Sequence, residues 1–255
     1  MENVAVIGGG QMGSQIAALS AMSGHKTSIY DNNKDYLNEK LVFTKNNIEN
    51  LVSKKILDQK KYDSYIKNLE VCETLEDAVK NKTFVIEAVV ERFEIKKEIF
   101  EKISNLLDEN VVLATNSSFI AASEIARTCK HPERFLNMHF FYPPLRMDLI
   151  EISFPESTKE EVVNRTKDIS KLMGRTVVTL KKETPGFIVN RMLGALIDEA
   201  YELYDEGIAD FKEIDLAIKK GLNHPLGPFE LTDYSGLDIS SVSYTHLTLP
   251  TNIGV

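Results

Sequence analysis

The spacing of apolar residues predicts that strands alternate with helices in the first part of the chain. Short apolar runs, the first at 4–7, are separated by longer polar or amphipathic stretches. A run without alternating polar residues is typical of a strand that is buried on both faces of a parallel sheet. Strands are expected at 4–7, 26–30, 83–88, 111–114, 134–140 and 176–180, and helices at 11–23, 34–67, 93–107 and 159–173.

This alternation favours βαβ units, because a helix is the usual connection between parallel strands. We therefore expect an α/β fold over residues 1–183, with a Rossmann-like, doubly wound and mostly parallel sheet. Between residues 188 and 204 apolar residues recur every three to four positions, which is typical of a long amphipathic helix with a wide buried face. A smaller all-helical domain is expected over 184–240, packed against other helices or against a second subunit.

Composition narrows the classes of function. The 255 residues include 30 Lys and Arg against 38 Asp and Glu, a net charge of −8, so the basic excess of a nucleic-acid or anionic-membrane binder is missing. No apolar run approaches the roughly 18 residues of a membrane span. Cys72 and Cys129 have no His or Cys at metal-ligand spacing, so neither a disulfide framework nor a metal site is expected. These observations predict a cytoplasmic protein whose partners include neither nucleic acid nor a membrane.

Residues 8–13, GGGQMG, fit the dinucleotide fingerprint G-x-G-x-x-G. The fingerprint follows the first expected strand and opens the first expected helix, whose N-terminus can bind a pyrophosphate. Asp31 ends the second strand 18 residues after Gly13, where an acid binds the adenosine ribose and repels a 2′-phosphate. The pattern predicts NAD as the cofactor, bound by Gly8, Gly9, Gly10, Gln11, Met12, Gly13 and Asp31.

Five further segments follow along the chain: ATNSS at 114–118, HFF at 139–141, LIE at 149–151, TPGFIVNR at 184–191 and GPFEL at 227–231. In this order they resemble the 3-hydroxyacyl-CoA dehydrogenase family, and in size the short-chain 3-hydroxybutyryl-CoA dehydrogenases. The resemblance covers about residues 1–238. It implies an NAD-dependent oxidoreductase of fatty acid and butanoate metabolism that interconverts (3S)-3-hydroxyacyl-CoA and 3-oxoacyl-CoA, with 3-hydroxybutyryl-CoA as the expected substrate.

The resemblance also implies roles for individual side chains. His139 is implied as the catalytic base and Glu151 as its partner, while Ser118 and Asn190 bind the substrate. A histidine suits this task, because oxidation of an alcohol requires removal of the hydroxyl proton near neutral pH. A carboxylate on the other ring nitrogen fixes the tautomer and stabilises the imidazolium. Because Asn190 opens the helical domain, we expect the active site to lie between the two domains.

Other candidates have simpler readings beside the functional one. Glu91 and Lys96 match family positions near the cofactor, as does Ser118, but the first two could equally begin a solvated helix. Lys54 could contact the phosphates of coenzyme A, or belong to a solvated helix face. Ser118 and Asn190, taken alone, could be turn or cap residues.

The chain departs from the family pattern at three places. Tyr142 stands where the family usually carries Asn, and Phe119 replaces the usual second Ser after Ser118. Residues 241–255 match no family motif and have no helical period, so we expect a truncated helical domain followed by a tail outside the family. The helical domain is also expected to form a homodimer.

Two alternatives to the leading function remain at the level of sequence. The first is a related NAD-dependent dehydrogenase of a free hydroxy acid or sugar acid, because the same His and Glu pair serves any secondary alcohol. The second is a catalytically inactive NAD-binding protein of this fold, because a fold does not determine an activity.

Overall fold

A computed structural model describes residues 1–235 and divides the chain after Glu183 into two compact units, 1–183 and 184–255. The division falls where the apolar pattern of the sequence changes. Residues 241–255, for which an origin outside the family is expected, lie outside the described residues.

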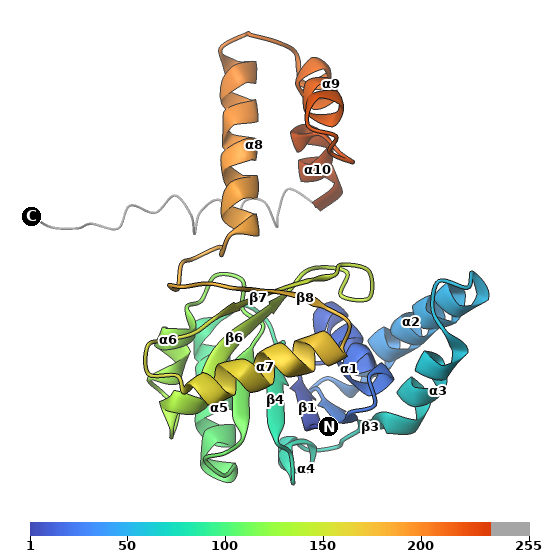
Figure 1. The fold of residues 1–255 in the computed structure, drawn as a ribbon, viewed down its shortest axis with the longest axis vertical. Coiled ribbons are helices and arrows are strands. Elements are labelled where there is room, and N and C mark those ends of the chain that lie inside the picture. Colours follow the sequence, from blue (N-terminus) through green and yellow to red (C-terminus); the bar gives the residue numbers. More distant parts are fainter. Residues whose placement is uncertain (236–255) are drawn as a thin grey trace, which may run out of the picture. The chain divides into compact units, whose positions relative to one another are not determined.

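The described part of the first unit contains one sheet with the strand order β3-β2-β1-β4-β5-β6-β7-β8 (Figure 1). Its first six strands follow the 3-2-1-4-5-6 order of a doubly wound nucleotide-binding fold. Neighbouring strands are parallel except for the antiparallel pair β6 and β7. The predicted Rossmann-like, mostly parallel sheet is therefore confirmed. The strands are β1 (Asn3–Ile7), β2 (Lys26–Tyr30), β3 (Leu69–Val71), β4 (Phe84–Glu87), β5 (Val112–Thr115), β6 (Phe135–Phe140), β7 (Leu149–Ser153) and β8 (Thr176–Thr179).

Helices cover both faces of the central strands, which explains why the apolar runs of the sequence do not alternate. Val4 and Val6 of β1 belong to a core on one face that includes Ile16, whereas Ala5 and Ile7 belong to a core on the other face. The helices of this unit are α1 (Gln11–Met22), α2 (Lys34–Ser53), α3 (Gln59–Asn68), α4 (Leu75–Val79), α5 (Phe93–Leu106), α6 (Ala122–Ala126) and α7 (Glu160–Leu172), with a 3-10 turn at Pro132–Arg134.

The helical region expected at 34–67 is two helices, so the prediction of one continuous region is wrong in this detail. Lys55 adopts a left-handed conformation with φ 57°, which ends the first helix. Asp58 then begins α3, because its carboxylate accepts a hydrogen bond from the backbone N–H of Lys60 at 2.9 Å.

Three helices form the described part of the second unit: α8 (Val189–Asp205), α9 (Phe211–Gly221) and α10 (Pro228–Ser235). The buried carboxylate of Asp215 in α9 accepts hydrogen bonds from the backbone N–H groups of Phe229 and Glu230, at 2.9 and 3.1 Å. It thereby caps α10, since these N–H groups have no partner within the helix. The Phe229 ring meets the Tyr201 ring edge to face at 4.9 Å and anchors α10 on α8.

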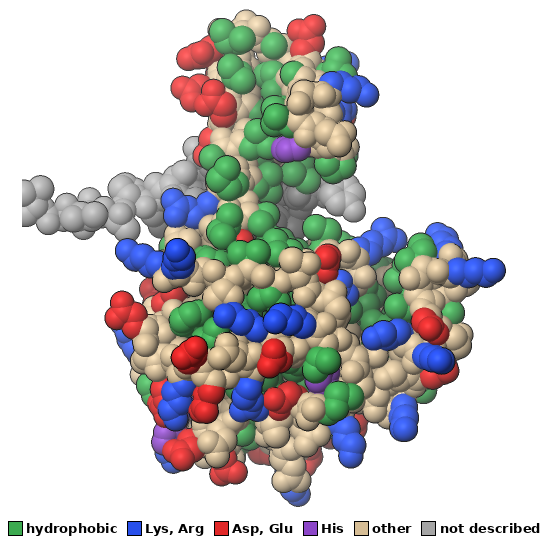
Figure 2. Space-filling view, in the orientation of Figure 1, with side chains coloured by type: hydrophobic (Ala, Val, Ile, Leu, Met, Phe, Trp, Pro, Cys, Tyr) green, Lys and Arg blue, Asp and Glu red, His purple; other side chains and the backbone are tan. Residues whose placement is uncertain are grey.

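The apolar face of α8 is only partly covered within residues 1–235. Ala200 is buried, but Met192 is 69% exposed, and Tyr201 and Tyr204 are also exposed. Figure 2 shows hydrophobic side chains at the surface of this helical unit. The wide face predicted from the sequence therefore exists, and α9 and α10 leave much of it open.

None of the helices within residues 1–235 has both the length and the apolar character that crossing a membrane requires.

Candidate active site

The glycine-rich loop joins β1 to α1 so closely that two of its glycines have no substitute. Gly8 has φ 102°, and a Cβ atom there would lie 2.6 Å from the backbone of Ala88. A Cβ atom at Gly13 would lie 1.8 Å from the carbonyl oxygen of Gly8. Gly10 is the N-cap of α1, without a side-chain cap and without an acidic residue in the first turn. The N-terminus of α1 is thus built to accept an anion such as a pyrophosphate.

Asp31 lies directly after β2, beside this loop. Its Oδ2 accepts a hydrogen bond from the backbone N–H of Gly9 at 2.7 Å, and its Oδ1 accepts one from Asn33 at 2.8 Å. An ionised carboxylate has about four acceptor positions, so two remain for the hydroxyl groups of a ribose. These contacts fix the carboxylate at the end of the loop. The glycines, the free helix N-terminus and Asp31 together fit an NAD cofactor, with Gln11 and Met12 beginning the helix.

His139 and Glu151 are directly opposite each other on the antiparallel strands β6 and β7. Side chains at directly opposed positions project from the same face of a sheet, and here the Nδ1 of His139 lies 3.2 Å from the Oε2 of Glu151. The two side chains are 4% and 1% exposed, so little water competes for the contact. The two residues are 12 positions apart in the sequence, a spacing that suits adjacent strands joined by a turn, and the structure has this arrangement.

Ser118 completes a line of three side chains. It lies in the loop after β5, and its Oγ is 3.2 Å from the Nε2 of His139. With a proton on Nδ1 facing Glu151, Nε2 accepts the hydroxyl hydrogen of Ser118. The histidine therefore presents an acceptor nitrogen on the side of Ser118, as a general base requires.

Glu91 and Lys96 lie close to this loop and form part of a buried charge network. The ammonium group of Lys96 lies 2.7 Å from the Oε1 of Glu87 and 3.2 Å from the Oε2 of Glu91. Burial opposes ionisation of Glu91, but Lys96 and the hydrogen bonds from Ser117 and Phe119 outweigh it and lower the pKa of Glu91. Burial also opposes the charge of Lys96, but Glu87 and Glu91 raise its pKa. Glu91 and Lys96 are thus held in their charged forms.

Sequence reasoning missed Glu87, which is fully buried at the end of β4. Its Oε2 accepts the hydroxyl hydrogen of Thr115 at 2.6 Å and its Oε1 accepts the backbone N–H of Val89 at 2.7 Å. An acidic residue ending an otherwise apolar strand was the one signal in the sequence, because a buried carboxylate needs a charged partner.

Three further residues singled out in the sequence are Lys54, Asn190 and Tyr142. Lys54 is the exposed C-cap of α2. Asn190 is the second residue of α8 in the helical unit, whereas Ser118 and His139 belong to the first unit. Tyr142 is half exposed directly after β6, and its peptide bond to Pro143 is cis.

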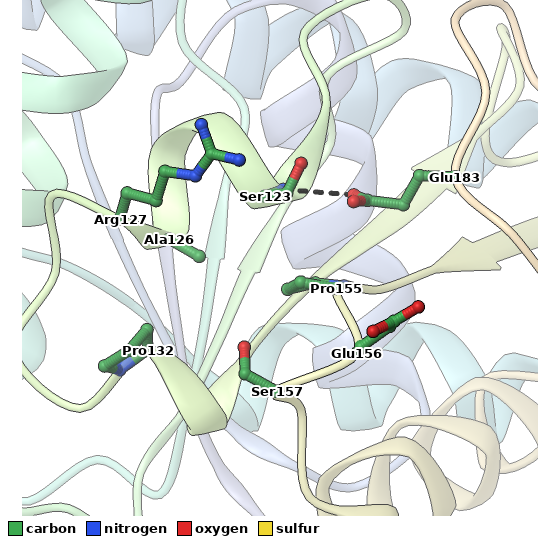
Figure 3. Close-up of a pocket in the computed structure, with 8 residues that line it drawn as sticks. All are labelled: Ser123, Ala126, Arg127, Pro132, Pro155, Glu156, Ser157 and Glu183. Atoms are coloured by element: carbon green, nitrogen blue, oxygen red, sulfur yellow. Dashed lines mark hydrogen bonds between the residues drawn. The ribbon is translucent and has the colours of Figure 1, made fainter.

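A separate cavity of about 380 Å³ lies among described residues at the beginning of β6, whereas His139 lies near the end of that strand. Figure 3 shows that two of its wall residues are joined directly, because the backbone N–H of Ser123 donates a hydrogen bond of 3.0 Å to the carboxylate of Glu183. None of the predicted site residues is among those that line this cavity, so it takes no part in the chemistry described above. Its walls are Ser123, Ala126, Arg127, Pro132, Pro155, Glu156, Ser157 and Glu183.

A doubly wound sheet with a dinucleotide loop and a buried His and Glu pair defines the class of NAD-dependent dehydrogenases. The sequence matches the NAD binding domain of 3-hydroxyacyl-CoA dehydrogenase over residues 3–184 and the C-terminal domain of the same enzyme over residues 186–251. The chain therefore belongs to the 3-hydroxyacyl-CoA dehydrogenase family. It is an NAD-dependent oxidoreductase of the family that interconverts 3-hydroxyacyl-CoA and 3-oxoacyl-CoA.

Similar proteins agree with this membership. The chain is 36% identical to human mitochondrial hydroxyacyl-coenzyme A dehydrogenase over 93% of its length and 77% of the relative. It is 35% identical to 3-hydroxybutyryl-CoA dehydrogenase of Clostridioides difficile over 92% and 83% of the two chains. The crystal structure of (S)-3-hydroxybutyryl-CoA dehydrogenase from Ralstonia eutropha superimposes with a TM-score of 0.91 at 31% identity, over 97% of this chain and 87% of that one.

The family match also bears on the end of the chain. The match to the C-terminal domain continues to residue 251, past residue 240, where the sequence patterns alone end the family-like part. Most of the stretch 241–255 is thus included in the matched region.

Proposed function

We propose that this chain interconverts (S)-3-hydroxybutyryl-CoA and acetoacetyl-CoA, with His139 as the catalytic base. The observation that carries the proposal is the line from Ser118 through His139 to Glu151, with both contacts at 3.2 Å. The four-carbon acyl group is supported by the relatives from Clostridioides difficile and Ralstonia eutropha, which are 3-hydroxybutyryl-CoA dehydrogenases.

In this mechanism His139 moves one proton and its neighbours hold it in place. During oxidation, Nε2 accepts the proton of the substrate hydroxyl while the hydrogen on the same carbon leaves as a hydride. NAD, when bound, supplies the acceptor for that hydride. The carboxylate of Glu151 accepts the Nδ1–H and stabilises the imidazolium that forms. In the reverse direction His139 returns the proton to the oxygen of the 3-oxo group.

Binding of the substrate requires side chains from both units. We assign Ser118 to hydrogen bonding of the substrate oxygen beside His139, and Asn190 to a second hydrogen bond from the helical unit. We assign the exposed Lys54 to the phosphates of coenzyme A, where a free ammonium group provides a point charge.

A panel of oxidised substrates tests the assignment. NADH consumption is measured with acetoacetyl-CoA, with free acetoacetate and with a 3-oxo sugar acid at equal concentrations. We expect turnover with the CoA thioester and at most about a hundredth of that rate with the free acids, because they lack the contacts of the coenzyme. Faster turnover of a free acid would favour the hydroxy-acid dehydrogenase, and no turnover of any substrate would favour an inactive NAD-binding protein.

We expect Asp31 to determine the preference of the protein for NADH over NADPH. NADH should bind at least about tenfold more tightly than NADPH, because the carboxylate accepts ribose hydroxyl groups and repels a 2′-phosphate. Fluorescence titration of both cofactors measures this ratio, and Asp31→Asn is expected to weaken NADH binding and to narrow the preference. Equal affinities in the unmodified protein would show that Asp31 does not face the ribose.

We also propose a homodimer that forms through the helical unit. The support is a set of exposed apolar side chains in this unit: Met192 of α8, Ile208 after α8 and Leu216 of α9 are 69%, 66% and 52% exposed. Exposed apolar patches of this kind are typical of protein interfaces. Light scattering should give twice the mass of one chain, and Met192→Glu should shift the protein toward the monomer. A single-chain mass at micromolar concentration contradicts the proposal.

The cytoplasm is the proposed place of action. Cys72 and Cys129 are both free thiols, and Cys129 is buried, where burial raises its pKa to about 12. Free and unreactive thiols are typical of a reducing compartment.

A further inference from the structure

The loop that carries Ser118 is attached to one carboxylate oxygen. The Oε1 of Glu91 accepts hydrogen bonds from the backbone N–H groups of Ser118 and Phe119, at 3.0 and 3.1 Å, and from the hydroxyl group of Ser117. Hydrogen bonds to an ionised acceptor are about twice as strong as those between neutral groups. Three consecutive residues of the loop are therefore held by Glu91.

Glu91 is itself held by the buried ammonium group of Lys96, which also binds the buried carboxylate of Glu87. Lys96 of α5 is 1% exposed, and it binds the other oxygen of Glu91 at 3.2 Å. Lys96 also binds Glu87 at 2.7 Å, and Glu87 accepts the hydroxyl hydrogen of Thr115, the last residue of β5. The ammonium group thus faces two carboxylates in the interior, so it fixes Glu91 to the ends of two central strands.

A second set of contacts joins the same loop to β6, the strand of His139. The side-chain oxygen of Asn116 accepts the backbone N–H of Phe140 at 2.9 Å. The side-chain amide of Asn137 donates to the carbonyl oxygen of Ser117 at 2.8 Å. The distance between Ser118 and His139 therefore depends on two sets of contacts: those of the loop with Glu91 and those of the loop with β6.

We infer that Glu91, held in place by Lys96, is the positioning residue for Ser118. This inference rests on the proposed function, because it assumes that Ser118 binds the substrate oxygen. The resemblance to the family implies a place near the cofactor for Glu91 and Lys96. The contacts give them a different task, since Oε1 faces the loop and the ammonium group of Lys96 faces carboxylates rather than solvent.

Removal of the Glu91 carboxylate leaves three loop donors without their acceptor, so the loop relaxes and Ser118 loses its place beside His139. We expect Glu91→Ala to lower kcat/KM for acetoacetyl-CoA by about tenfold or more, the scale of a lost hydrogen bond to a charged group. Glu91→Gln keeps an acceptor oxygen but loses the ion pair, so its loss is expected to lie between that of the alanine variant and the unmodified protein.

A double-mutant cycle with Ser118→Ala tests whether Glu91 acts through Ser118. Once the hydroxyl group is absent, its position no longer matters. The variant with both changes should therefore have a kcat/KM less than about twofold below that of Ser118→Ala alone, because the effects of substitutions at residues that act as one unit are not additive. The dissociation constant of NADH, measured by fluorescence, should stay within about twofold in every variant.

The matched control is Glu101→Ala in α5, the helix that carries Lys96. Glu101 forms a surface ion pair with Lys97 at 4.0 Å, with side chains 46% and 38% exposed. Such pairs contribute little, so neither kcat/KM nor NADH binding should change.

Two results would overturn the inference while leaving the proposed function in place: multiplicative losses in the cycle, or a tenfold weaker NADH affinity for Glu91→Ala, which would show a direct cofactor contact. A Ser118→Ala variant with normal kinetics overturns the inference and the proposed role of Ser118 together. If Glu91→Ala does not fold, Glu91→Gln supplies the same cycle.

Discussion

Replacement of His139 by alanine is expected to lower the turnover number by about two to four orders of magnitude, the usual scale of lost general acid and base catalysis. The imidazole lies between the hydroxyl group of Ser118 and the carboxylate of Glu151, at 3.2 Å from each. Stopped-flow or steady-state NADH consumption with acetoacetyl-CoA measures the loss. NADH binding should survive, because the glycine-rich loop and Asp31 belong to other strands of the sheet.

Glu151→Gln separates the role of the charge from the role of the shape. The amide is close in size to the carboxylate, but it cannot stabilise an imidazolium, and its NH2 group can face Nδ1 and select the wrong tautomer. A severe loss of turnover with a nearly unchanged KM is therefore expected. Near-normal turnover of either variant would mean that another residue is the base.

The largest effect on stability is expected for Lys96→Met. The methionine has a similar length but leaves the buried Glu87, and Glu91 with its side chain 33% exposed, without their cation. Removal of one partner from a buried ion pair typically costs about 3–5 kcal/mol, because the other charge stays buried and unpaired. Urea denaturation followed by circular dichroism measures the free energy of unfolding. Lys97→Met, at an exposed position of the same helix, is the control and should change it little.

The loss in Lys96→Met should also depend on pH. In the unmodified protein the pKa of Glu91 is lowered, so its ionised form contributes stability that is lost as the pH falls through that pKa. Without Lys96, the pKa of Glu91 is higher than in the unmodified protein, because burial opposes ionisation. The variant therefore loses less stability than the unmodified protein as the pH falls. The gap between the two proteins should therefore narrow from pH 7 toward pH 4. A gap that stays constant over this range would show that the charges do not dominate the cost.

The central strands and the dinucleotide loop could be predicted from the sequence because one local rule governs each. Strands buried on both faces need apolar runs, as residues 4–7 of β1 and 112–114 of β5 show. Gly13 packs against the backbone of Gly8 five residues earlier, and Asp31 follows at the end of the next strand, so the fingerprint has a fixed local spacing. The contact of Gly8 with the backbone of Ala88, in contrast, is long-range. His139 and Glu151 lie opposite each other because a turn leads the chain from β6 back along it as the antiparallel strand β7.

Short and long-range features could not be predicted in this way. Three elements are too short for a periodic pattern of apolar residues to be recognised in the sequence. They are the strand Leu69–Val71 and the helices Leu75–Val79 and Ala122–Ala126. Glu91 accepts hydrogen bonds from three loop residues that follow it by 26 to 28 positions. Glu87 contacts Thr115, which follows it by 28 positions. Only the order of the strands brings such residues together.

The measurement that tests the account most directly compares NADH consumption by the unmodified protein and by His139→Ala, each with saturating acetoacetyl-CoA. The account predicts rapid consumption by the unmodified protein, formation of (S)-3-hydroxybutyryl-CoA, and a rate about two to four orders of magnitude lower for the variant. Both proteins should bind NADH with the same affinity. Equal rates in the two proteins, or no consumption by the unmodified protein despite tight NADH binding, would contradict the assignment of His139 as the base of an active dehydrogenase.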